Sequence, residues 1–114
     1  MATKTDERVG KYIQDFKENI GKEPDVGLIR NITEYLHTVV FRDDAETVAA
    51  TDKTELETVK NNFLIKKLGL PDNSDLDVGL NAMIEKYGKS NRNKYRVVLY
   101  YLLTEYFEKE AIFK

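Results

Sequence analysis

A basic, polar segment between residues 86 and 96 carries five basic side chains and no acidic one. We call it the basic segment, and its candidate binding residues are Lys89, Ser90, Asn91, Arg92, Asn93, Lys94 and Arg96. Ser90 is a typical N-cap residue, so the last long helix is predicted to begin there. Because a helix N-terminus carries partial positive charge and free N–H groups, it favours an anion and disfavours further cations. The segment is therefore predicted to bind an anionic ligand or a protein partner.

Two other interpretations of the basic segment stay open. In the first, its role is structural, because it is neutralised by acidic residues of the same chain, such as Glu55, Glu57, Asp43 and Asp44. In the second, the protein is an enzyme that acts on a phosphorylated or acidic small molecule. Its anion would be held by Lys89, Arg92 and Arg96, and Glu55 would serve as general base.

The same stretch resembles two motifs of nucleotide and nucleic-acid binding proteins. Gly88-Lys89-Ser90 matches the end of a phosphate-binding loop, but Met83 stands where that motif requires a glycine, which excludes it. The helices predicted on either side of Gly88 also resemble a helix-turn-helix, which would present Asn91, Arg92 and Lys94 to nucleic acid. Since the polar character ends after Arg96, nucleic acid is a possible partner but not a favoured one.

The sequence offers little for catalysis or metal binding. It contains no cysteine, and His37 is its single histidine, so neither a metal centre nor a Ser/His/Asp arrangement is expected. We name no catalytic residue and no cofactor, and a non-enzymatic binding or interaction protein is the leading interpretation. Asn61 lies on a helical stripe with Leu64 and Leu68, and we expect it to form a buried, structural hydrogen bond.

Helices are the elements that must position these residues. Apolar side chains recur at steps of three and four in five segments, at 6–20, 25–40, 52–68, 74–87 and 90–109. The helix at 52–68 carries two nearly opposite apolar stripes and should pack on two sides, whereas the last helix is apolar almost all round and should be central. Residues 38–51 are ambiguous. We favour a helix end followed by a partly buried loop over a hairpin between 38–41 and 47–50.

These patterns predict an all-α protein, a compact single-domain bundle of about five helices with the last long helix central. The 114 residues fit one helical domain, 1–114, of which 1–5 are expected to be disordered. Residues 1–58 carry 8 basic and 13 acidic side chains, whereas the rest carries 10 and 7, so positive charge gathers in the second half. No signal peptide and no membrane-spanning run is recognisable, so we expect a cytoplasmic protein with no membrane partner.

Three blocks of the sequence resemble one known family. They are Lys53–Leu70, Gly88–Arg96 and Tyr100–Leu103, and their pattern is similar to the signature of domain of unknown function 2853. The resemblance extends over nearly the whole chain. It implies a bacterial, cytoplasmic, helical protein of uncharacterised activity, and it supplies no catalytic residue.

Overall fold

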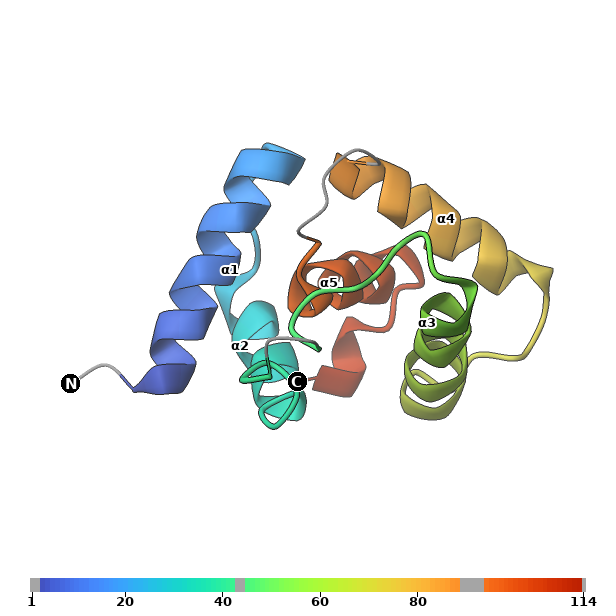
Figure 1. Ribbon diagram of the computed structural model, residues 1–114, viewed down its shortest axis with the longest axis horizontal. Coiled ribbons are helices and arrows are strands. Elements are labelled where there is room, and N and C mark those ends of the chain that lie inside the picture. The colour runs from blue at the N-terminus through green and yellow to red at the C-terminus, as the bar shows by residue number, and fades with distance from the viewer. Residues whose placement is uncertain (1–2, 43–44, 89–93, 114) are drawn as a thin grey trace.

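The predicted apolar stripes form helices in the structure, a computed structural model that describes residues 3–42, 45–88 and 94–113. Figure 1 shows their arrangement. In chain order they are α1 (Lys4–Ile20), α2 (Val26–Tyr35), α3 (Lys53–Thr58), the π-helix η1 (Val59–Lys67), α4 (Ser74–Gly88), α5 (Arg96–Tyr106) and the 3₁₀-helix η2 (Glu110–Phe113). In these ranges there is no strand, only an isolated antiparallel bridge between Thr47 and Tyr95. The prediction of an all-α fold is confirmed.

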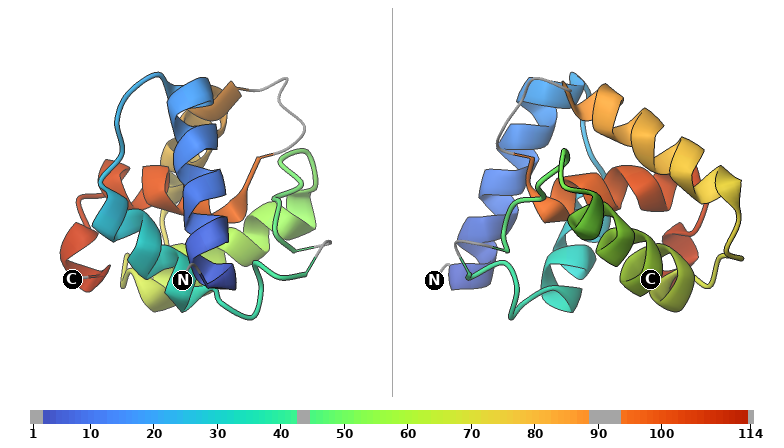
Figure 2. Two further views of the ribbon diagram at one scale, coloured as in Figure 1. Left: turned by 90° about the vertical axis from the view of Figure 1, so that its left-hand side faces the viewer. Right: turned by 45° about the vertical axis from the view of Figure 1, so that its right-hand side comes forward.

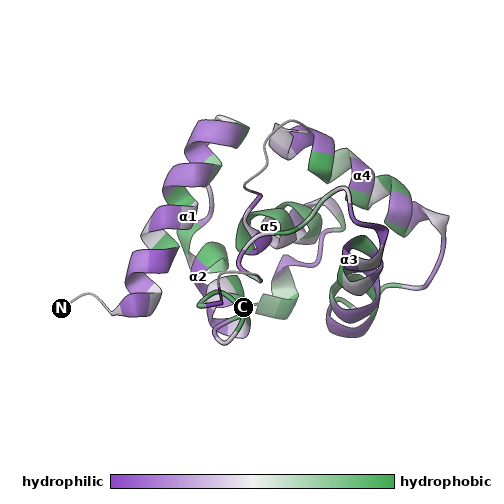
Figure 3. Ribbon diagram, in the orientation of Figure 1, coloured by the Kyte–Doolittle hydropathy of each residue, from purple (hydrophilic) through white to green (hydrophobic). Residues whose placement is uncertain are grey.

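Helix α5 is the centre of the molecule. The other helices surround it in all three views (Figures 1 and 2), and residues 96–104 are all buried. Apolar colour covers most of α5, whereas the polar colour of α1 lies on its outer side (Figure 3). The radius of gyration is 13.2 Å, which equals the roughly 13 Å expected for a compact chain of this length. The predicted central position of the last long helix is therefore confirmed.

Several helix ends follow the predicted capping residues. Asp25 caps α2 by accepting a hydrogen bond from the Leu28 N–H, and Gly21 ends α1 with a φ of +82°. Gly69 ends η1 with a φ of +73°, in the left-handed region that glycine favours. One end differs from its prediction. Residues 3–5, expected to be disordered, form the cap and first turn of α1, because Thr3 and Asp6 make a reciprocal capping box.

The helix predicted at 52–68 changes its winding halfway. It begins as α3 and continues as η1, in which the Leu68 N–H donates to the Phe63 carbonyl five residues earlier. This wider winding puts residues four and five apart on one face, so Val59, Phe63, Leu64 and Leu68 are buried together. The prediction of two opposite packing faces was therefore wrong. Asn61, expected to make a buried hydrogen bond, is exposed because the same winding rotates it to the outer face.

The ambiguous segment between α2 and α3 is a run of turns followed by a loop, as favoured from the sequence. Val40 and Val48 are buried, so the loop packs on the core. A hairpin between 38–41 and 47–50 is not formed. Thr47 instead pairs with Tyr95, and the flanking hydrogen bonds run from the Val48 N–H to the Lys94 carbonyl and from the Arg96 N–H to the Glu46 carbonyl, at 2.8 Å each.

This pairing also determines where α5 begins. Tyr95 is held extended, with a φ of −66° and a ψ of 134°, and α5 begins after it at Arg96. The predicted start at Ser90 was therefore wrong. No helix in the described part of the chain is long and apolar enough to cross a membrane.

Candidate functional site

The structure describes both ends of the basic segment but not its middle. Lys89, Ser90, Asn91, Arg92 and Asn93 lie outside the described residues, whereas Lys94 and Arg96 lie within them. Lys94 and Arg96 are both buried, with 3% and 8% of their surface exposed, whereas Lys86 at the start of the segment is exposed. Burial lowers the pKa of Lys94, because its charged form loses hydration. This part of the segment therefore points into the protein instead of forming an exposed basic surface.

Arg96 is neutralised inside the protein by an acid that the sequence had suggested. Its guanidinium donates to the Glu55 carboxylate of α3, to the Ala45 carbonyl at 2.8 Å and to the Tyr100 hydroxyl at 3.1 Å. At this residue the structural interpretation of the basic segment therefore holds. In the enzyme interpretation Glu55 was a general base, but here its carboxylate is engaged by a cation. Of the other suggested acids, Asp43 and Asp44 lie outside the described residues.

The helix-turn-helix interpretation does not fit the structure. A recognition helix must expose one face to nucleic acid. Helix α5 has no such face, because every residue from 96 to 104 is buried. The second helix of the supposed motif is the central helix of the core, and the alternative based on it was wrong.

A hollow of about 280 Å³ lies beside the Arg96–Glu55 pair, and we call it the aromatic hollow. Its walls include Tyr35, Phe63 and Tyr100. The rings of Phe63 and Tyr100 are stacked, with centroids 3.9 Å apart and planes 18° apart. The Nζ of Lys67 lies over one of these rings, 4.8 Å from the centre of Tyr35. The hollow thus combines aromatic walls with one ion pair.

A second cluster surrounds Glu46, which lies in the loop that precedes α3. Its carboxylate accepts hydrogen bonds from Arg8 at 2.7 Å, from Lys11 at 3.2 Å and from the Tyr12 hydroxyl at 2.7 Å. Lys11 and Tyr12 follow Arg8 by three and four positions on α1, so all three donors can reach the same carboxylate. Burial, followed by the bond to Glu46, raises the pKa of Tyr12 far above its ordinary value. We call these four residues the Glu46 cluster.

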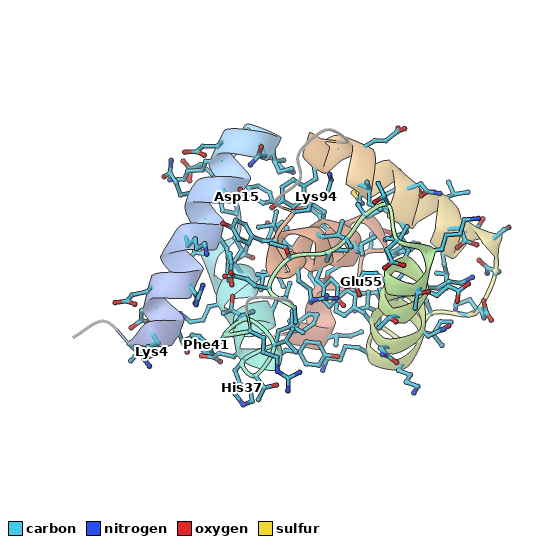
Figure 4. The ribbon with its side chains drawn as sticks, in the orientation of Figure 1. Lys4, Asp15, His37, Phe41, Glu55 and Lys94 are labelled. Carbon is cyan, nitrogen blue, oxygen red and sulfur yellow. The ribbon has the colours of Figure 1, made fainter. Side chains whose placement is uncertain are left out.

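Next to the Glu46 cluster, α1 borders a larger hollow of about 630 Å³, which we call the basic hollow. It is lined by Lys4, Glu7, Arg8, Lys11 and Phe41. The guanidinium of Arg8 lies 5.3 Å from the centre of the Phe41 ring. Lys4 and Phe41 lie near the N-terminal end of α1 in Figure 4, whereas Asp15 and Lys94 lie nearer its other end. The three cations exceed the two acids, Glu7 and Glu46, by one positive charge.

The basic hollow is connected to the basic segment through Tyr95. The Nζ of Lys11 lies 4.7 Å from the centre of the Tyr95 ring, and the Tyr95 N–H donates to the Tyr87 hydroxyl at 2.9 Å. Tyr87 in turn donates to Asp15 of α1. Burial raises the pKa of Asp15, although the Tyr87 bond opposes this. Tyr95 and Tyr87 therefore fix the end of the basic segment against α1.

Sequence reasoning missed the cations of α1. The chain up to residue 58 is acidic overall, and this net charge concealed the cations of its first helix. Lys4, Arg8 and Lys11 follow each other at steps of four and three, the spacing of one helical face. That spacing was the available signal, but nothing in it indicates that Glu46 holds two of these cations.

The remaining polar candidates form no catalytic or metal-binding arrangement. His37 is exposed, and its Nδ1 lies 3.1 Å from the Glu34 carbonyl. Among the described residues no three His, Asp or Glu side chains are grouped so that they could hold a metal ion.

A protein-family model described as "Protein of unknown function (DUF2853)" matches residues 11–111. The match includes the three blocks on which the resemblance rested. One residue from each block lies in the lining of the aromatic hollow, where Arg96 donates to both Glu55 and Tyr100. No curated protein matches the chain.

Proposed function

The chain belongs to this family of unknown function, and from its geometry we propose that it is a non-enzymatic binding protein that holds an anionic group in the basic hollow. The observation that carries the proposal is the grouping of Lys4, Arg8 and Lys11 around one hollow beside the exposed ring of Phe41. A hollow of about 630 Å³ lies within the usual range of about 300–1,000 Å³ for small-molecule sites.

The Glu46 cluster supports the proposal because it holds two of the cations in place before any ligand arrives. Glu46 is 9% exposed and cannot itself be reached easily, whereas the Arg8 and Lys11 side chains are 28% and 39% exposed. One carboxylate cannot neutralise two cations, so positive charge remains toward the solvent. An arginine has five N–H donors, and its bond to Glu46 uses one of the terminal nitrogens. Preorganised donors of this kind bind an anion with less loss of side-chain entropy.

The basic segment belongs to the proposal through its position in the chain. Residues 89–93 immediately precede Lys94 and Tyr95, and the Tyr95 ring packs against Tyr12 of α1. The role of Lys89 and Arg92 stays a prediction from the sequence, because both lie outside the described residues. A phosphate or carboxylate group is the matching chemistry, since both accept several charge-assisted hydrogen bonds.

The test measures the melting temperature at low ionic strength with inorganic phosphate and with adenosine diphosphate. We expect both anions to raise it by mass action, and added sodium chloride to reduce the rise by screening. Lys4→Glu should remove most of this rise, because Lys4 lines the hollow but takes no part in the Glu46 cluster. Lys66→Glu is the matched control, with the same change of charge on the exposed side of η1.

Two results would contradict the proposal. In the first, neither anion stabilises the wild-type protein at low ionic strength. In the second, Lys66→Glu weakens the stabilisation as much as Lys4→Glu does, which would mean that only net charge matters. Arg92→Ala examines the basic segment separately, and an undiminished rise in that variant would remove the segment from the site.

A further inference from the structure

The aromatic hollow has the form of a small-molecule site, which is separate from the basic hollow. Apolar side chains make most of its wall, including Leu36, Val39, Phe63 and Tyr100, and a few polar side chains complete it. Binding sites for small molecules are mostly apolar with a few placed polar groups. At about 280 Å³ the hollow lies near the lower end of their range, which suits a ligand of one or two rings.

The polar side chains in the lining of the hollow offer hydrogen-bond acceptors and donors to a ligand. Arg96 engages one oxygen of Glu55, Oε1, and among the described residues no other side chain donates to that carboxylate. The Glu55 side chain is 25% exposed, so its second oxygen can accept from a ligand. Asn62, on the exposed part of the lining, adds both an amide donor and an amide acceptor.

The charges of the hollow disfavour an ionic ligand. Glu55 and Arg96 neutralise each other at close range. An anion would have to compete with Glu55 for Arg96, and breaking such a pair leaves a buried charge without its partner. A cation would meet Arg96 and, over the Tyr35 ring, Lys67. An uncharged ligand with a donor for Glu55 avoids both costs.

The walls favour a planar ligand. Tyr35 is 41% exposed, and Phe113 packs edge to face against its ring with centroids 5.7 Å apart. Planar heterocycles stack well on exposed aromatic rings, and here the ligand would replace the flexible Lys67 side chain, whose Nζ lies 4.8 Å from the centre of the Tyr35 ring.

We infer that the aromatic hollow binds a small, uncharged, planar heterocycle that carries a hydrogen-bond donor beside an acceptor, as a nucleobase does. The donor pairs with Glu55, the acceptor faces Asn62, and the ring stacks on Tyr35. This site is independent of the proposed function, because its ligand needs no negative charge and touches no residue of the basic hollow.

The test is a titration of the full chain with adenosine, followed by two-dimensional NMR. N6,N6-dimethyladenosine serves as the matched ligand, because it keeps the planar ring and loses the amino donor. We expect adenosine to shift the Asn62 side-chain amide and the Tyr35 ring signals, and dimethyladenosine to bind about tenfold more weakly. Tyr35→Ala should weaken adenosine binding about tenfold through the lost stacking.

Tyr106→Ala is the matched protein control, since Tyr106 is 43% exposed and lies outside the hollow. The Tyr106→Ala variant should bind adenosine with the affinity of the wild type. The Lys4→Glu variant should do so too, because it impairs only the basic hollow. The inference is overturned if no signal of the hollow shifts at millimolar adenosine, if the two nucleosides bind equally, or if Tyr106→Ala loses as much affinity as Tyr35→Ala.

Discussion

The Glu46 cluster allows the energetic coupling between α1 and the loop before α3 to be measured. The two changes are Glu46→Ala and Tyr12→Phe, alone and combined. The Tyr12 side chain is 0% exposed, and its hydroxyl donates to Glu46 at 2.7 Å. Each single change removes one partner of that bond, whereas the double change removes both.

The loss of unfolding free energy in each variant follows from the groups that the change leaves buried without a partner. Glu46→Ala leaves the Tyr12 hydroxyl buried without this acceptor, which costs about 1–3 kcal/mol. Arg8 and Lys11 are partly exposed and regain water, so their lost ion pairs add only about 0–1 kcal/mol. Tyr12→Phe leaves Glu46 its two cations and should cost about 0.5–1.5 kcal/mol. The double variant should be about 1–2 kcal/mol more stable than the sum of the single effects predicts, since no orphaned hydroxyl remains.

The assay is urea denaturation followed by far-ultraviolet circular dichroism, with all variants at one pH and one ionic strength. Glu85→Ala serves as control, because Glu85 is exposed on α4, and it should change the free energy of unfolding by less than about 0.5 kcal/mol. Single effects that add within about 0.5 kcal/mol would refute the reasoning, because they would show that Tyr12 and Glu46 do not depend on each other.

Three further predictions concern the packing of the helices and the charge of Asp15. Gly79→Ala should destabilise the protein by about 1–3 kcal/mol despite better helix propensity, because the new Cβ would lie 2.5 Å from the Phe107 ring. A Cβ added at Gly10 would have no neighbour within 4 Å, so Gly10→Ala should instead stabilise the protein by about 0.5–1 kcal/mol. Urea denaturation of both variants separates the effect of crowding from that of helix propensity. Leu102→Ala should cost about 2–5 kcal/mol in the same assay, because Leu102 is 1% exposed in the central helix, and a loss below about 1 kcal/mol would contradict that position. The pKa of Asp15 is raised in the folded state above its ordinary 3.8, so the folded protein holds this proton more tightly than the unfolded chain does. The resulting stabilisation is present at low pH and is lost as the pH rises through the raised pKa. The free energy of unfolding of Asp15→Asn should therefore increase relative to wild type between pH 4 and pH 7, and a difference that does not change with pH would contradict the raised pKa.

Much of the fold could be predicted because it depends on neighbours in the sequence. The caps at Asp25 and Asp52 and the left-handed glycines at positions 21 and 69 act within one helical turn. The apolar periodicity of residues 97–104 likewise indicates a helix buried on all sides. Local rules of this kind determine where helices begin and end, and which of them is central.

Other features were decided by the tertiary structure. Ser90 has the chemistry of an N-cap, but α5 begins at Arg96 because Tyr95 pairs with Thr47, a residue far away in the chain. The π winding of η1 brings residues of the two predicted stripes, Val59, Phe63, Leu64 and Leu68, onto one buried face. Helical periodicity assumed a constant winding and could not anticipate this.

At the candidate sites, too, some features follow from the sequence and others only from the tertiary structure. The sequence by itself determined that cations are concentrated at 86–96, and it gave Glu55 as one of four acids that could neutralise them. Only the tertiary structure selected Glu55 for Arg96, across 41 positions, and Glu46 for Arg8, across 38. A charged side chain can pair with any opposite charge within reach, and sequence distance does not say which one folding brings there. The choice of ion-pair partners therefore depends on how the helices pack around α5, because that packing determines which opposite charges lie close together away from water.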